Sequence, residues 1–128
     1  INFEEFRAPK LLNCKMAEYA KAVVTGRPQF HISLVVDVSP NCDCHAENDI
    51  PIVPNVGMFA SFDPVALDQA CADAVNKQPV VAGSQLDKMP KVHGDHFTDS
   101  APQTDWRVGI NHAVKIGLGT NQYELIEI

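Results

Sequence analysis

The sequence predicts an α/β domain in which a mixed sheet is packed by about three helices. Apolar residues recur three and four positions apart over residues 11–25 and again over residues 63–77, which is the spacing of one helix face. Residues 30–38, with the sequence FHISLVVDV, are rich in β-branched side chains that favour strands. A chain of 128 residues is long enough to bury a core, so we expect one domain over residues 1–128.

The first helix is expected over Leu11–Thr25. Gly26 suits the left-handed residue that follows many helices, and Pro28 prevents continuation. The strand over residues 30–38 is apolar on both faces near its middle, so we expect it in the centre of the sheet. The residues expected to form the buried face of the helix are Leu12, Met16, Tyr19, Ala20 and Val23.

Turn-forming residues dominate residues 39–51 and predict a loop. Residues 52–60 favour a short second strand, in which a proline and a glycine indicate an edge position or a bulge. Asp63 followed by Pro64 predicts the start of the clearest helix, because Asp caps helix N-termini and Pro fits the first helical position. We expect this helix to reach Lys77.

Residues 78–104 show little periodicity and are expected to wrap the surface. A last helix is predicted over Asp105–Ile116, with Asp105 as its cap. Gly117-Leu118-Gly119 then ends this helix rather than opening one, which argues against a dinucleotide-binding loop. Tyr123–Ile128 is predicted to be a closing strand, with Tyr123 and Leu125 on one face and Ile126 and Ile128 on the other. Glu124 and Glu127 fall on opposite faces, so the burial of this strand is left open.

Composition narrows the class of protein. The net charge is −6 and the basic residues are scattered, so no nucleic-acid partner is expected. No apolar run approaches the roughly 20 residues of a membrane-spanning helix, so no membrane partner is expected either. Four cysteines are too few for a disulfide-dense secreted scaffold, and a reducing cytoplasm is expected. The chain opens at Ile1 without Met, and we expect it to be a fragment of a longer polypeptide.

Two thiols and an imidazole lie close together in the loop over residues 39–51. Cys42, Cys44 and His45 fall within four positions, and thiolate and imidazole are common ligands of zinc, copper and iron–sulfur iron. The alternative is a loop whose cysteines are incidental. The ligand set cannot be completed from the sequence, and its further candidates are His31, Asp43, Asp49, His93 and His96.

Two carboxylates of the helix after residue 62 are further candidates. Asp63 and Asp68 are five residues apart and do not share a helix face, and Asp63 already serves as the cap. Asp68 lies near the Cys71 face, as either a buried hydrogen-bonding centre or a site residue; the structural role is favoured. The run containing His93 and His96 resembles a small metal-binding tract, but a solvated segment is favoured there.

Several motifs together resemble one family. Asn41-Cys42-Asp43-Cys44, residues 51–58 (PIVPNVGM) and residues 63–70 (DPVALDQA) resemble the DUF362 family, whose members are often called uncharacterised iron–sulfur centre proteins. Many members carry a ferredoxin-like segment with Cys-x-x-Cys repeats upstream, and none of those repeats occurs here. The resemblance therefore implies that this chain is the C-terminal portion of a longer iron–sulfur protein. Its family's reaction is not established.

From the residues and the resemblance together, three functions are open. In the first, Cys42 and Cys44 face an iron–sulfur cluster or a single transition metal ion, and Asp43, His45, Asp63 and Asp68 shape the site for electron transfer or cluster handling. In the second, the domain is a non-catalytic scaffold that docks the missing ferredoxin-like segment or a redox protein partner. In the third, Cys42 or Cys44 serves a thiol redox enzyme.

Overall fold

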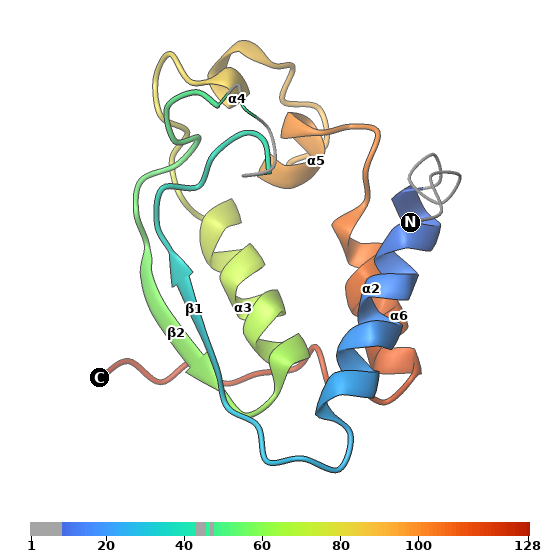
Figure 1. Cartoon of the computed structure of the whole chain (residues 1–128). Coiled ribbons are helices and arrows are strands. Elements are labelled where there is room, and N and C mark those ends of the chain that lie inside the picture. Colours follow the sequence, from blue (N-terminus) through green and yellow to red (C-terminus); the bar gives the residue numbers. More distant parts are fainter. Residues whose placement is uncertain (1–8, 43–45, 47) are drawn as a thin grey trace.

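The structure is a computed structural model that describes residues 9–42, 46 and 48–128 (Figure 1). Within these residues the elements follow the order α2, β1, β2, α3, α4, α5, α6. The longer helices are α2 (Pro9–Val24), α3 (Pro64–Asn76) and α6 (Trp106–Lys115), and the short ones are α4 (Gln85–Lys88) and α5 (His96–Ser100). The strands are β1 (His31–Val35) and β2 (Gly57–Ser61).

The elements form three layers, with α3 between the sheet and the paired helices α2 and α6 (Figure 1). Strands β1 and β2 pair antiparallel, with His31 opposite Ser61 and Val35 opposite Gly57. One face of this sheet packs on α3. The predicted α/β class, with a sheet packed by helices, is confirmed.

Local sequence explains why α3 begins where it does. The Asp63 carboxylate accepts hydrogen bonds from the amides of Val65 (2.9 Å) and Ala66 (3.1 Å), and Pro64 occupies the first turn. These bonds satisfy amides that have no partner inside the helix. The predicted cap and the predicted helix are both confirmed.

The core lies in two clusters at opposite ends of α3. One cluster joins the sheet, the β1–β2 connection and the later loops, and includes Val53, Val75 and Leu86. The other joins α2, α3 and α6 through Ala17, Val65 and Ala113. The side chains of this second cluster are small, so they leave space for a hollow between α2, α3 and α6.

Four details of the prediction are wrong. Strand β1 pairs only with β2 in the described residues, so it is not central. Tyr123–Ile128 forms no strand; its glutamates leave neither face wholly apolar, and Tyr123 instead donates a hydrogen bond to Asp73 (2.8 Å). Residues 78–104, for which no helix was predicted, contain the short helices α4 and α5. Asp105 is the N-cap residue of α6 as predicted, although its side chain makes no cap hydrogen bond. The fourth detail is that the predicted buried face of α2 is largely open, since Met16, Tyr19 and Val23 are all exposed.

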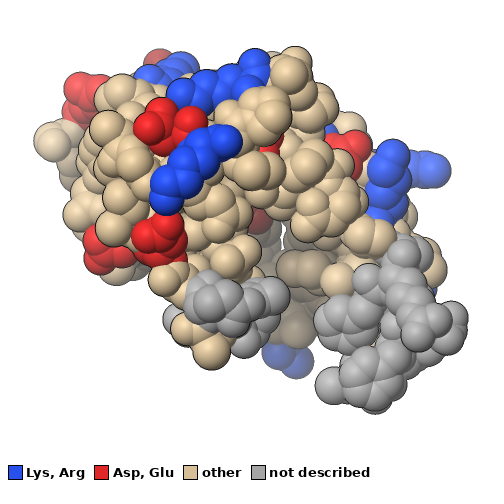
Figure 2. Space-filling model, turned by 90° about the horizontal axis from the view of Figure 1, so that it is seen from above, with Lys and Arg blue, Asp and Glu red and all other residues tan. Residues whose placement is uncertain are grey.

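Charged side chains of both signs lie close together at the end of the molecule near α4 (Figure 2). Lys91 pairs with Asp87 (3.5 Å) and Lys88 with Asp49 (3.8 Å). Such exposed pairs contribute little stability. None of the described helices combines the length and the apolar character needed to cross a lipid bilayer.

Candidate functional site

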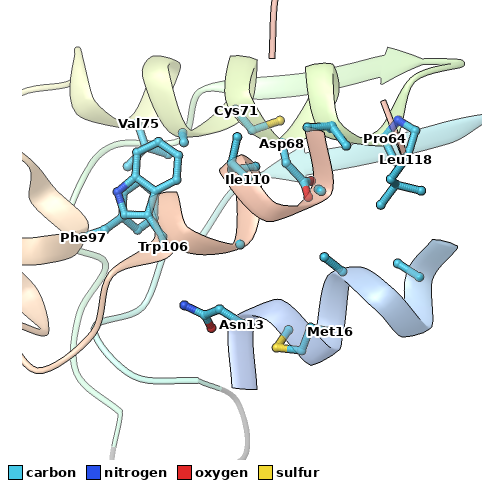
Figure 3. A pocket seen from close by; sticks show the side chains of 16 residues that line it. Asn13, Met16, Pro64, Asp68, Cys71, Val75, Phe97, Trp106, Ile110 and Leu118 are labelled. Carbon is cyan, nitrogen blue, oxygen red and sulfur yellow. The ribbon is translucent and has the colours of Figure 1, made fainter. Parts of the chain in front are cut away.

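A hollow of about 480 Å³ lies between α3 and the paired helices α2 and α6 (Figure 3). Its walls are mostly apolar side chains, among them Met16, Ile110 and Leu118. Phe97 and Trp106 line the part nearest α5, with ring centroids 5.8 Å apart. Volume and lining both resemble those of small-molecule sites in proteins.

Asp68 is the charged member among the described residues that line this hollow. Its carboxyl group projects from α3 toward α6 and α2 (Figure 3). Burial raises the pKa of Asp68, although the nearby His31 lowers it. The Asp68 residue is exposed, and no hydrogen bond from another described residue affects its pKa, so the structure does not support the favoured role as a buried hydrogen-bonding centre.

Cys71 lies one turn further along α3 and lines the same hollow. Burial raises the pKa of the Cys71 thiol; a hydrogen bond with Ser33 lowers it, and the Asp68 charge raises it further. A thiol held neutral in this way is a weak nucleophile. Cys71 therefore contributes to the wall of the hollow as a small, half-buried, neutral group.

Asp63 has a structural role at the N-terminus of α3. Besides capping α3, its second carboxylate oxygen accepts a hydrogen bond from the Thr120 amide (2.8 Å). The chain after α6 is thereby fixed to the start of α3. A Cβ at Gly119 would lie only 2.7 Å from Cγ of Asp63, so only glycine permits this close approach.

The described part of the connection between β1 and β2 passes the end of α3 opposite Asp63 (Figure 1). Cys42 belongs to this connection and is exposed. Asp43, Cys44 and His45 fall outside the described residues. Of the described residues, no three His, Cys, Asp or Glu side chains converge in a way that would hold a metal ion. The structure therefore does not bring Asp63 and Asp68 to Cys42, and the ligand set predicted around Cys42 and Cys44 stays a prediction.

The other histidine candidates have hydrogen-bond partners of their own. His93 Nδ1 contacts Asp99 Oδ1 at 2.7 Å, and His96 Nε2 contacts the Gln78 carbonyl at 2.9 Å. His31 Nε2 contacts Gln29 at 3.0 Å. Burial alone would raise the pKa of Asp99, but hydrogen bonds from His93 and the Val92 amide hold it below its usual value.

Sequence reasoning missed Asp95, which caps α5 and bonds it to α6. This carboxylate is 2 % exposed and accepts hydrogen bonds from the Phe97 amide (2.9 Å), the Thr98 amide (3.1 Å) and Trp106 Nε1 (2.9 Å). Arg107 pairs with the same carboxylate and lies over the Trp106 ring, 4.6 Å from its centroid. Asp95 thus positions the indole that lines the hollow. The Asp-His-Phe order is a cap signal that sequence reasoning could have found.

Comparisons with known proteins identify a family and no function. No curated protein and no solved structure matches the chain. A family model described as "Domain of unknown function (DUF362)" matches residues 4–73, which include the cysteine loop, Asp63 and Asp68. The α6 wall of the hollow and Trp106 lie beyond the match. Because the match spans more than half of the chain, this protein belongs to the DUF362 family.

Proposed function

We propose that this chain is a structural domain of an iron–sulfur protein, and that the open face of its sheet docks a ferredoxin-like segment or a redox protein. The open apolar face of the sheet supports the proposal. Ile32 is 59 % exposed, Leu34 66 % and Met58 68 %, although all three are large apolar side chains. Sheet faces of this kind are normally covered, because uncovered apolar area costs free energy in water.

The open face extends beyond the paired residues. Leu34 lies opposite Met58 and Ile32 opposite Ala60, so their side chains share the side of the sheet that faces away from α3. Phe30 and Phe62 continue the surface, with ring centroids 5.0 Å apart and exposures of 56 % and 75 %. We call the residues Phe30, Ile32, Leu34, Met58 and Phe62 the open sheet face. A continuous apolar surface of aromatic and aliphatic side chains suits a protein partner.

The family supplies the expected occupant. Members with the motifs found here are expected to carry a ferredoxin-like segment, so the partner that the open sheet face would meet is a small iron–sulfur domain. Free thiols at Cys14 and Cys71 support a reducing compartment such as the cytoplasm.

Replacing two residues of the open sheet face should weaken docking by about 100-fold. Each of Ile32→Ser and Leu34→Ser removes roughly 1.5 kcal/mol of apolar burial in the complex, so the double variant loses about 3 kcal/mol. The dissociation constant is measured by isothermal titration calorimetry, with a two-cluster ferredoxin titrated into this chain. Val92→Ser is the matched control, since Val92 is 72 % exposed but lies outside the open sheet face.

The identity of the partner that covers the open sheet face is tested by crosslinking in the native gene product inside cells. A photo-crosslinking amino acid at Leu34 should link to a peptide containing Cys-x-x-Cys repeats, and one at Val92 should not. A link from Leu34 to Leu34 of a second copy would show a homo-oligomer instead and would refute the proposed partner. Equal crosslinking at both positions would refute docking through this face.

A metal site at the cysteine loop is the second candidate function. One observation favours it, since Cys42 is exposed and can be reached by an incoming ion or cluster. Two thiolates one residue apart can bind one soft metal ion or one face of an iron–sulfur cluster. Electron transfer or cluster handling would then take place at this end of the molecule, with Cys42 and Cys44 as ligands.

Replacing Cys42 and Cys44 together by Ser should abolish bound metal in anaerobically purified native protein, because a neutral hydroxyl group does not replace a thiolate ligand. Elemental analysis and the visible absorption spectrum measure the loss. Cys14→Ser with Cys71→Ser is the control pair and should retain metal. An unchanged metal content in the first variant would refute the site. Fast alkylation of Cys42 or Cys44 near neutral pH in metal-free protein would instead favour the thiol redox enzyme.

A further inference from the structure

We propose that the hollow between α2, α3 and α6 binds a small organic cation, an ammonium group on an apolar body, with Asp68 as its counter-ion. The hollow lies on the side of α3 away from the sheet, so this inference is independent of the docking proposed for the open sheet face.

The walls of the hollow define the apolar body of the ligand. Met16 of α2, Val75 of α3 and Ile110 of α6 offer aliphatic contact, and Trp106 adds an aromatic surface. The volume of about 480 Å³ suits a molecule of roughly drug-fragment size. Small residues such as Ala17 and Gly109 keep the facing helices from filling this space.

Asp68 defines the charge of the ligand. Among the described residues that line this hollow there is no Lys, Arg or His. His31, which lowers the pKa of Asp68, lies outside this lining and contacts Gln29. Lys21, a neighbouring cation on α2, donates to the Ile116 carbonyl instead. An ammonium group would give Asp68 the charge-assisted hydrogen bonds that it lacks. An anion would be repelled, and a neutral ligand would leave the carboxylate unpaired.

The surroundings of Asp68 point to the same ligand chemistry. The Asp68 residue is exposed at the edge of the hollow, yet the surrounding protein atoms raise the pKa of its carboxyl group. An attraction between this carboxylate and a cation would grow as a bound ligand excludes water. Asp68 also borders a second hollow, which is lined in part by Phe30, His31 and Ile32. The neutral thiol of Cys71 beside it does not compete for the cation.

The test uses 2-phenylethylamine as the cationic probe and 2-phenylethanol as its neutral counterpart. Trp106 is the single tryptophan of the chain and lines the hollow, so its fluorescence reports binding. We expect saturable binding of the amine, at least tenfold tighter than binding of the alcohol. In Asp68→Asn the affinity for the amine should fall at least tenfold and become equal to that for the alcohol.

Asp73→Asn is the matched control, because Asp73 lies on the same helix, bonded to Gln69, and does not line the hollow. It should leave amine binding unchanged. Circular dichroism of each variant checks that the helices are retained, and amide chemical shifts locate the probe, with Gly109 expected to move and Gly83 to stay. Equal affinity for amine and alcohol in the unaltered protein, or amine binding unaffected by Asp68→Asn, would overturn the proposal.

Discussion

Replacing Asp95 by alanine should lower the free energy of unfolding by about 3 kcal/mol, the largest effect that we expect from a single substitution. Asp95 is nearly fully buried and accepts hydrogen bonds from two amides of α5 and from the Trp106 indole. The change removes a helix cap, worth about 1 kcal/mol, and leaves a partly buried indole N–H without its acceptor, which costs about 1–3 kcal/mol.

Urea unfolding followed by Trp106 fluorescence and by circular dichroism measures this loss. Arg107→Ala serves as the comparison, because the Arg107 side chain is half exposed and returns to water at small cost. We expect it to destabilise by less than about 1 kcal/mol. If Arg107→Ala proved as damaging as Asp95→Ala, the ion pair rather than the hydrogen bonds would hold α5 to α6.

Asp95 also makes stability depend on pH. Burial alone would raise the pKa of Asp95, but hydrogen bonds from Trp106 and the Thr98 amide, and the Arg107 charge, hold it below its usual value of 3.8. As the pH falls, the unfolded chain therefore binds a proton at this carboxyl group before the folded chain does. The stabilisation is present above pH 3.8 and disappears as the pH drops through the lower folded pKa. Asp95→Asn should flatten this dependence in part, since Asp99 has a pKa shifted in the same direction.

Replacing Gly119 by alanine should lower the free energy of unfolding by about 2 kcal/mol, although the change adds a single methyl group. That methyl would overlap the Asp63 carboxylate, with 2.7 Å to Cγ and 2.9 Å to Oδ2. The carboxylate cannot move away without leaving the Val65 and Ala66 amides and the Thr120 amide. The helix cap and the link to the chain after α6 are therefore lost together.

Gly109→Ala is the matched control within the same protein. Gly109 lies inside α6, and a Cβ there would meet Asn13 at an ordinary 3.6 Å. Because alanine favours the helix over glycine by up to about 1 kcal/mol, this substitution should leave stability unchanged or raise it. Thermal unfolding of both variants gives the comparison. Equal stability of Gly119→Ala and the unaltered protein would show that the Asp63 side chain can shift without a loss of stability.

Local signals predicted the three longer helices well, but they did not predict the short helices α4 and α5. The start of α3 follows from Asp63 and Pro64, whose effects act within one turn, and the structure begins the helix at the predicted place. The end of α2 lies next to Gly26, which has a positive φ of 72°, as the sequence predicted. The cysteine motif and the motif around Asp63 likewise indicated the family, and the family match confirms it.

Predictions that depend on distant neighbours failed more often. The spacing of Met16, Tyr19 and Val23 predicts a helix, yet it does not say whether another element covers that face, and none of the described ones does. The closing strand failed for a similar reason, because the extended segment Tyr123–Ile128 needs a partner strand to form a ladder, and it has none among the described residues. The sequence indicated Asp68 as a candidate site residue. It did not indicate that the Asp68 carboxyl group faces a hollow, because that depends on how α2 and α6 pack against α3.

The sequence by itself determined the fold class, the positions of the main helices and the family, because caps, turns and motifs involve residues close together in the chain. Only the tertiary structure decided which apolar surfaces stay open and which carboxylates are paired. Asp95 meets Trp106 eleven residues away and Asp63 meets Thr120 across 57 residues, whereas Asp68 faces a hollow shared by three helices. Burial and pairing are properties of such distant contacts, and the order of residues along the chain does not specify them.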